Sequence, residues 1–261
     1  MNNFFMGVDI GSRTGKAIIL DRKGKIVDKC ITDTSDTTEK TFQNLINSFP
    51  ISIRSSITYS VGTGYGRTAL ENSVDKTLTE ISCHFRGAGL LFSSFGTVID
   101  MGGQDSKLII SDEKGDIHNF IMNDRCAAGT GRFLEIMCDR LGFSIEEFAE
   151  MDISGIPVLP INSTCTVFAE SEVVSLLASD TDRNIVASSI ALMSARNMYN
   201  MFRKVAGVPP VCMTGGVSRI NPVKKHLEKL IGEVIITHET GQYAGALGAA
   251  LTALSTGENH V

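Results

Sequence analysis

An internal repeat without gaps is the feature that most constrains the fold of this chain. Residues 9–26 read DIGSRTGKAIILDRKGKI, and residues 100–117 read DMGGQDSKLIISDEKGDI. The same Asp, Gly, Lys, Ile-Ile, Asp, Lys-Gly and Ile occur at the same positions of both copies. Such self-similarity indicates one supersecondary unit that is used twice.

Each copy predicts a β-meander. An apolar strand precedes the first Asp, a second strand follows the shared Lys, and a Lys-Gly turn then reverses the chain toward a third strand. Two related meanders predict two lobes, with a ligand in the cleft between them. We expect residues 1–95 to form the first lobe and residues 96–241 the second, with the boundary near residues 93–96.

The rest of the chain alternates between helix and strand patterns, so the fold class is α/β. Ser144 and Glu147 predict a capping box at the start of a short helix. The expected helices cover residues 124–141 (stopping at Gly142), 167–178, 182–205, a segment from 221, and 243–254. The expected strands here are residues 211–214 and 234–237.

The glycines at the first turn of each meander predict phosphate-binding loops. Gly11-Ser12 and Gly102-Gly103 expose backbone N–H groups that a phosphate can approach closely. Asp9 and Asp100 end the preceding strands, where a carboxylate can hold Mg²⁺ or its waters. Gly215-Gly216 gives a third glycine pair after a predicted strand.

Two familiar nucleotide-binding motifs do not fit. Residues 11–16 are one residue short of a Walker A loop and are followed by Ala17, and residues 62–66 do not match G-x-G-x-x-G. Lys16 and Lys107 are candidate point charges for phosphates or, alternatively, solvated strand residues.

Composition limits the classes of partner. The net charge of −5 and the scattered Lys and Arg residues argue against a surface for nucleic acid or an anionic membrane. The first residues, MNNFFM, carry no charged n-region of a signal peptide. We therefore expect a cytoplasmic protein whose partners are small molecules and proteins.

Two of the six cysteines stand out by their position. Cys126 and Cys165 lie at or near the start of predicted helices, where the helix dipole lowers a thiol pKa and favours the metal-binding thiolate. A four-iron cluster takes four cysteines, and a two-fold dimer supplies four from two per chain. The alternative is that both are small core residues, as we expect for Cys138 and Cys212.

Eight segments in chain order resemble one known family: DIGSRTGK, VGTGYGR, EISCHFRGAG, IDMGGQDSK, MNDRCAAGTGRFLE, NSTCTVFAESEV, TGGVSR and GALGAAL. They are similar to the ATP-dependent activators (component A) of 2-hydroxyacyl-CoA dehydratases, which are relatives of the ATPase subunits of benzoyl-CoA reductase. The resemblance extends from Val8 to Leu251. The two cysteine-bearing segments are specific, whereas DIGS and TGG point only to the wider superfamily of sugar kinases, chaperone ATPases and actin.

The resemblance implies a two-lobed, actin-like ATPase fold of the ribonuclease H-like type. ATP or ADP with Mg²⁺ would lie in the interlobe cleft, and the C-terminal helix, at about residues 242–257, would pack back on the first lobe. The implied catalytic residues are Asp9, Asp100 and Gln104, the two aspartates holding Mg²⁺ directly or through water. The implied nucleotide-binding residues are Gly11, Ser12, Arg13, Thr14, Lys16, Gly102, Gly103, Asp105, Gly129, Thr130, Gly131, Gly215 and Gly216.

The same resemblance implies one [4Fe–4S] cluster per homodimer, bound by Cys126 and Cys165 of each subunit in the second lobe. ATP hydrolysis would drive one electron from ferredoxin or flavodoxin to a dehydratase. An electron-transfer subunit of a benzoyl-CoA reductase-type enzyme is an alternative. Alternatives of other classes are a small-molecule kinase, which would be colourless, and an actin-like module with a four-cysteine zinc site, which metal analysis would identify.

Overall fold

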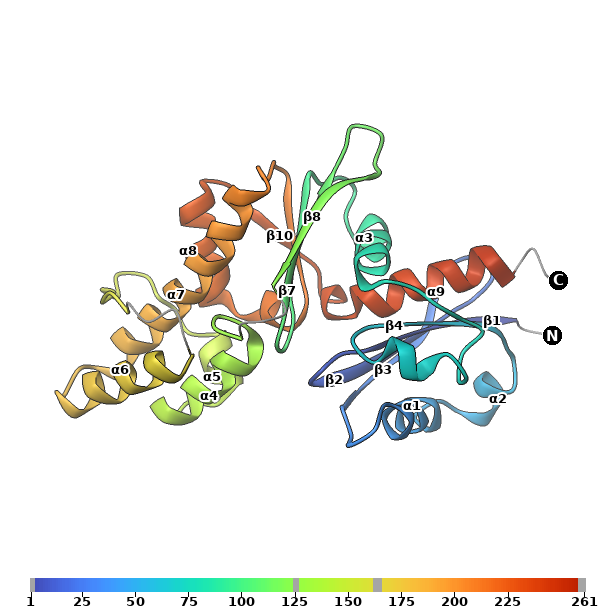
Figure 1. Cartoon of the computed structure of the whole chain (residues 1–261), viewed down its shortest axis with the longest axis horizontal. Helices are drawn as coiled ribbons and strands as arrows, with labels where there is room; N and C mark the ends of the chain where they lie inside the picture. Colours follow the sequence, from blue (N-terminus) through green and yellow to red (C-terminus); the bar gives the residue numbers. More distant parts are fainter. Residues whose placement is uncertain (1–2, 124–126, 162–165, 258–261) are drawn as a thin grey trace. The chain divides into compact units, whose positions relative to one another are not determined.

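The computed structural model describes residues 3–123, 127–161 and 166–257. The chain divides into two compact units, Met1–Ser94 with His238–Val261 (unit 1) and Phe95–Thr237 (unit 2). Each unit contains a five-stranded mixed sheet and helices (Figure 1). Unit 1 is therefore built from both ends of the chain.

The sheet of unit 1 contains the first repeat. The elements of this unit are β1 (Phe4–Ile10), β2 (Thr14–Leu20), β3 (Ile26–Asp33), α1 (Thr38–Asn47), α2 (Ile51–Arg54), β4 (Ile57–Thr63), η1 (Arg67–Leu70), β5 (Lys76–Thr77), α3 (Glu80–Leu91), η3 (Gly241–Tyr243) and α9 (Ala244–Gly257). The strand order is β3-β2-β1-β4-β5. β1 runs antiparallel to β2 and parallel to β4, and Asp9 is paired with Lys16.

Helices cover both faces of this sheet, α1 on one and α9 with α3 on the other (Figure 1). Val8 of β1 packs with Leu45 of α1, and the adjacent Gly7 faces α9. A Cβ on Gly7 would lie 2.0 Å from the carbonyl O of Ala246. Because only glycine leaves room for this approach, α9 packs against the backbone of β1 itself.

Unit 2 repeats the same topology. Its elements are β6 (Thr97–Met101), β7 (Ser106–Ser111), β8 (Ile117–Asn123), α4 (Gly131–Leu141), α5 (Ile145–Ala149), α6 (Thr166–Ala178), α7 (Arg183–Lys204), β9 (Val211–Thr214), η2 (Gly216–Arg219), α8 (Asn221–Ile231) and β10 (Ile235–Thr237). The strand order is β10-β9-β6-β7-β8. β6 runs antiparallel to β7 and parallel to β9, and Asp100 is paired with Lys107. The predicted duplication of the meander is confirmed.

One large hydrophobic core joins the sheet of unit 2 to its helices. Ile99 and Leu108 of the sheet pack in it with Phe133 of α4, Ile190 of α7 and Val223 of α8. Each such buried side chain contributes about 1.5–3 kcal/mol of transfer free energy. The core therefore fixes α4, α7 and α8 against the sheet that carries the second glycine turn.

Helix ends predicted from local signals are confirmed in several places. α4 ends before Gly142, which adopts φ 69°, and α5 carries the predicted capping box of Ser144 and Glu147. Asp182 caps α7 by accepting a hydrogen bond from the N–H of Asn184.

The predicted start of the first helix of unit 2, at residue 124, is wrong within the described residues. Residues 127–130 form a turn, and α4 begins only at Gly131. The helix does not extend back to residue 124, because Gly129 has φ +89° and Thr130 has the extended conformation of a residue that precedes a helix. The turn places the first N–H groups of α4 next to the glycine loop of the same unit.

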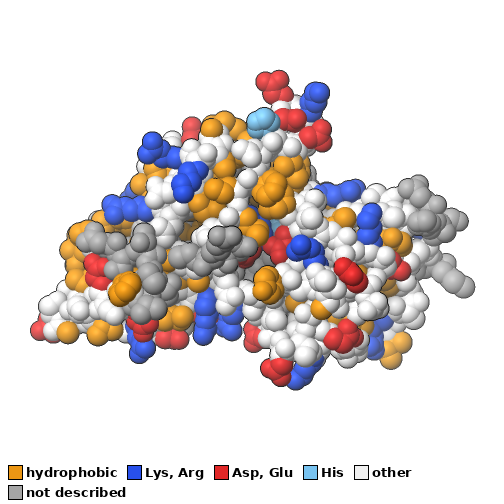
Figure 2. Space-filling model, in the orientation of Figure 1, with side chains coloured by type: hydrophobic (Ala, Val, Ile, Leu, Met, Phe, Trp, Pro, Cys, Tyr) orange, Lys and Arg blue, Asp and Glu red, His pale blue; other side chains and the backbone are white. Residues whose placement is uncertain are grey.

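Charged side chains of both signs are interspersed on the face shown in Figure 2. Among the helices of the described part, none combines the length and the apolar character needed to cross a bilayer.

Candidate nucleotide-binding site

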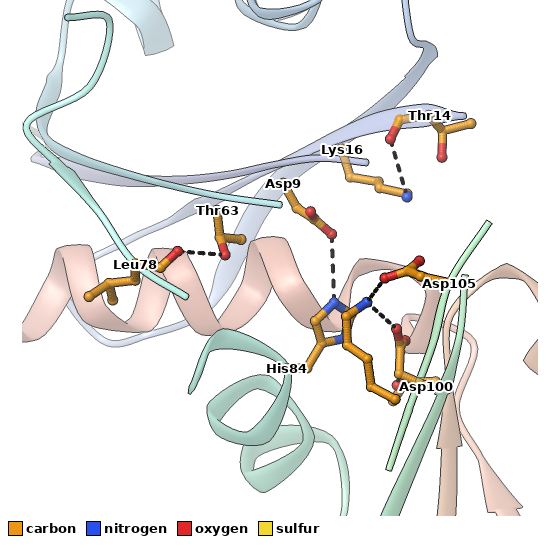
Figure 3. Close-up of polar contacts among 10 residues, drawn as sticks. Asp9, Thr14, Lys16, Thr63, Leu78, His84, Asp100 and Asp105 are labelled. Atoms are coloured by element: carbon orange, nitrogen blue, oxygen red, sulfur yellow. Dashed lines mark hydrogen bonds and ion pairs between the residues drawn. The ribbon is translucent and has the colours of Figure 1, made fainter. Parts of the chain in front are cut away.

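The first glycine turn joins β1 to β2. Asp9, at the end of β1, is 6% exposed. The N–H of Gly11 donates to the carbonyl O of Thr14 at 3.2 Å, which closes the turn around residues 12–13. Lys16 Nζ donates to the same carbonyl at 3.3 Å (Figure 3). The ammonium group of Lys16 therefore lies at this turn.

His84 of α3 is a residue of this region that the sequence analysis did not select. Its Nε2 lies 3.9 Å from Asp9 Oδ2, and its side chain is buried (Figure 3). A Cβ on Gly245 of α9 would come within 2.6 Å of that carboxylate oxygen. The signal was available in the EISCHFRGAG segment, where a polar residue occupies a buried position of a helix.

The second glycine turn repeats the first. The N–H of Gly102 donates to the carbonyl O of Asp105 at 2.9 Å. Asp100 is 2% exposed and accepts hydrogen bonds from Thr214 Oγ1 at 2.9 Å and from Lys107 Nζ at 3.4 Å. Lys107 also forms an ion pair with Asp105. Thr214 was not selected from the sequence as a site residue.

Lys107 is therefore a buried cation between two carboxylates, not a solvated strand residue. Its side chain is 3% exposed, and a charge at that depth requires compensation by opposite charges. Asp100 and Asp105 provide it. Gln104, in contrast, is exposed at the tip of the same turn.

The turn before α4 lies against the second glycine turn. The N–H of Gly131 donates to the carbonyl O of Gly102 at 3.0 Å. Asn197 of α7 holds the turn from the other side, since its Nδ2 donates to the carbonyl O of Ala128 at 3.1 Å. The structure thus brings residues 129–131 and residues 102–105 together, as the predicted site requires.

The third glycine pair, Gly215-Gly216, also lies at this site of unit 2. Gly215 follows β9 with φ +80°, and a Cβ there would lie 2.3 Å from the carbonyl O of Met101. A larger residue would therefore be strained in conformation and would collide with the end of β6. Unit 2 in this way gathers Asp100, the turn at 102–105, the start of α4 and residues 215–216, while Asp9, Gly11 and Lys16 form a second group in unit 1.

Cys126 and Cys165 lie outside the described residues. The four cysteines inside them are free thiols, and burial raises the pKa of Cys138 and Cys212 to about 12. Both are packing residues, as predicted. Within the described segments, no group of three or more His, Cys, Asp and Glu side chains is arranged to hold a metal ion.

Comparison with known proteins decides the family. The model of the BadF/BadG/BcrA/BcrD ATPase family matches residues 6–253. The chain belongs to the BadF/BadG/BcrA/BcrD ATPase family. Within this family, it is similar to the (R)-2-hydroxyglutaryl-CoA dehydratase activating ATPase of Acidaminococcus fermentans, with 40% identity over 97% of this chain and 98% of the relative. It is also 39% identical to the activator of lactoyl-CoA dehydratase of Anaerotignum propionicum, over 96% and 97% of the two chains.

A solved structure extends the comparison to the fold. The activator of the 2-hydroxyisocaproyl-CoA dehydratase from Clostridium difficile with bound ADPNP superposes with a TM-score of 0.90 and 34% identity, over 98% of this chain and 96% of that one. The protein thus has the two-lobed, actin-like fold of the BadF/BadG/BcrA/BcrD ATPase family, and each of the two sheets described above contains one copy of the duplicated meander.

Proposed function

We propose that this protein is an ATP-hydrolysing electron donor that activates a 2-hydroxyacyl-CoA dehydratase. The observation that carries the proposal is the similarity, over nearly the whole chain, to relatives named as activators of such dehydratases. The two buried aspartates at the glycine turns add a physical basis for ATP chemistry. Ferredoxin or flavodoxin would supply the electron.

The phosphates of ATP would be bound by backbone N–H groups of both glycine turns. Gly11 and Gly102 would shape these turns, because their N–H groups close the turns by donating to the carbonyl O atoms of Thr14 and Asp105. The N–H groups of the residues inside each turn would then bind the phosphates. The proposed nucleotide-binding residues of unit 1 are Gly11, Ser12, Arg13, Thr14 and Lys16. Those of unit 2 are Gly102, Gly103 and Asp105, with Gly129, Thr130 and Gly131 alongside and Gly215 and Gly216 toward the adenosine.

Asp9 and Asp100 would hold Mg²⁺, and the exposed amide of Gln104 would orient the attacking water. The oxygens of Asp100 already accept hydrogen bonds from Thr214 and Lys107. We therefore expect Asp100 to bind Mg²⁺ through a water molecule, an arrangement that Mg²⁺ readily accepts.

A [4Fe–4S] cluster, which would supply one-electron transfer, would be bound by Cys126 and Cys165 of two subunits. The other cysteines are poor ligands, because burial holds the pKa of Cys83, Cys138 and Cys212 at about 12 and thiolate is the ligating form. Cys165 directly precedes α6, and the positive end of a helix dipole favours a thiolate at this place in the sequence.

The test is an activation assay under anoxic conditions with a 2-hydroxyacyl-CoA dehydratase, a low-potential reductant and this protein in substoichiometric amount. Dehydration of the acyl-CoA should require ATP and should exceed one turnover per activator. Equal activity with ADP would contradict ATP-driven electron transfer. Phosphorylation of a sugar or carboxylic acid at enzyme-like rates would instead support the kinase alternative. Activation of a benzoyl-CoA reductase-type enzyme alone would assign the protein to that partner.

A further inference from the structure

The N-terminus of α4 is hydrogen bonded to the second glycine turn. Gly131 donates its N–H to the carbonyl O of Gly102 at 3.0 Å, and Arg132 donates to that of Gly103 at 2.7 Å. First-turn N–H groups have no partner within their own helix, so this loop satisfies them. Any displacement of the loop by a phosphate therefore acts directly on the start of α4.

α4 can carry such a displacement to its other end. It spans Gly131–Leu141 and buries one face, including Phe133 and Met137, which keeps it helical over its length of about 16 Å. Near its last turn, Arg140 reaches across to Glu170 of α6. Its Nε and Nη2 both lie 2.7 Å from Glu170 Oε1.

α6 is held by core contacts and by this ion pair. Ala169 and Val173 lie in the core of unit 2, and Leu176 and Leu177 pack against it. On the other side of the helix, Phe168 is 67% exposed and Val174 is 50% exposed. The side chain of Glu170 is 30% exposed, and its ion pair with Arg140 ties the first half of α6 to the last turn of α4.

We propose that the Arg140–Glu170 ion pair is the positioning contact that makes α6 follow α4 when the nucleotide changes. This inference rests on the proposed function, in which Cys126 and Cys165 bind the cluster, because α4 follows Cys126 in the sequence and α6 directly follows Cys165. The ion pair links the phosphate loop to the segment of the second cysteine, so the two cluster-binding segments of one subunit respond together.

The pair is suited to coupling because it is half exposed. Exposed ion pairs contribute little to the stability of a fold, so its removal should leave the protein folded and able to take up iron. Coupling between two sites depends instead on contacts that differ between two states, and a single contact along such a route can change the coupling by roughly two- to thirtyfold.

The experiment compares the wild type with Glu170→Gln, Arg140→Gln and the exchanged pair Arg140→Glu/Glu170→Arg. The matched control is Lys225→Gln, which breaks the 3.1 Å ion pair with Asp152 in the same unit without touching α4 or α6. The first measurement is amide hydrogen exchange of α6 in iron-free protein with ATP and with ADP. The second is the rate at which bathophenanthroline disulfonate captures iron from the iron-loaded protein with each nucleotide.

In the wild type and in Lys225→Gln, exchange in α6 and iron capture should both depend on the nucleotide. Glu170→Gln and Arg140→Gln should reduce the ratio of the two capture rates toward unity, by roughly two- to thirtyfold. Both should abolish the nucleotide effect on exchange in α6 but not at the start of α4. The exchanged pair should restore the nucleotide effect in α6.

Single variants that keep the wild-type nucleotide effect in α6 would overturn the inference, even if the iron-loaded protein activates a dehydratase. A wild type that binds no iron would count against the proposed function, while the exchange measurement would still decide on the ion pair.

Discussion

Two Asp–Lys pairs occupy the same register in the two repeats but have different surroundings. Asp9 faces Lys16 across β1 and β2, and Asp100 faces Lys107 across β6 and β7. Lys16 bonds a backbone carbonyl, whereas Lys107 is buried between Asp100 and Asp105. Duplication preserved the positions of the residues, while the side-chain environment diverged.

This difference predicts unequal effects of the same substitution. Lys107→Met should lower the free energy of unfolding by about 3–5 kcal/mol, because it leaves a buried carboxylate without its partner. Lys16→Met should cost only about 1 kcal/mol, the usual worth of one hydrogen bond. Urea unfolding of the two variants measures both changes in the free energy of unfolding. Equal changes would show that Lys107 does not compensate the buried charge of Asp100.

The cysteines predict a second contrast between similar substitutions. Cys126→Ser or Cys165→Ser should remove two ligands from the site of a dimer, since symmetry copies the change, and the protein should lose its brown colour. Cys138→Ser, at a core thiol whose pKa burial raises to about 12, should keep the colour. Visible absorption after anoxic purification shows which variants keep the cluster. A coloured Cys126→Ser protein would contradict the assignment of Cys126 as a ligand.

At the scale of elements, helix packing in unit 1 depends on glycines where backbones meet. A Cβ on Gly87 of α3 would lie 2.0 Å from the carbonyl O of Ala244, and one on Gly248 of α9 would lie 1.8 Å from that of Cys83. α3 and α9 therefore cross in direct backbone contact. Neither helix can move away without exposing the sheet that carries Asp9.

Two alanine substitutions in α3 test this packing. Gly87→Ala should destabilise unit 1 by about 3 kcal/mol or more, because the overpacked atom is backbone that cannot rotate aside. Gly89→Ala, with no atom within 4 Å of the added Cβ, should instead stabilise the protein by up to about 1 kcal/mol through helix propensity. Thermal unfolding of both variants is the measurement. A Gly87→Ala variant that unfolds at the wild-type temperature would contradict the close crossing of α3 and α9.

Sequence patterns predicted those helices and strands whose ends depend on local signals. The meanders, the strand Val211–Thr214 and the ends of α4 and α7 followed from repetition, turn glycines and caps, which are local signals. The start of α4 was missed because the loop at 102–103, distant in sequence, supplies its first partners. His84 and Thr214 were missed for a similar reason, since only tertiary packing brings them to Asp9 and Asp100.

At the scale of the whole molecule, each unit supplies one group of proposed ATP ligands, and a cluster would need a second copy of the chain. One chain carries two cysteines in a suitable sequence context, and its described part holds no group of three or more His, Cys, Asp and Glu side chains placed to hold a metal ion. The proposed electron transfer therefore requires a homodimer, whereas the proposed ATP hydrolysis would use residues of one chain.

Iron counting on the anoxically purified protein tests whether two chains share one cluster. We predict a brown protein with about four iron and four sulfide per dimer, and a Cys126→Ser variant without iron. A colourless protein, zinc in place of iron, or about four iron per single chain would contradict the proposal of a shared cluster.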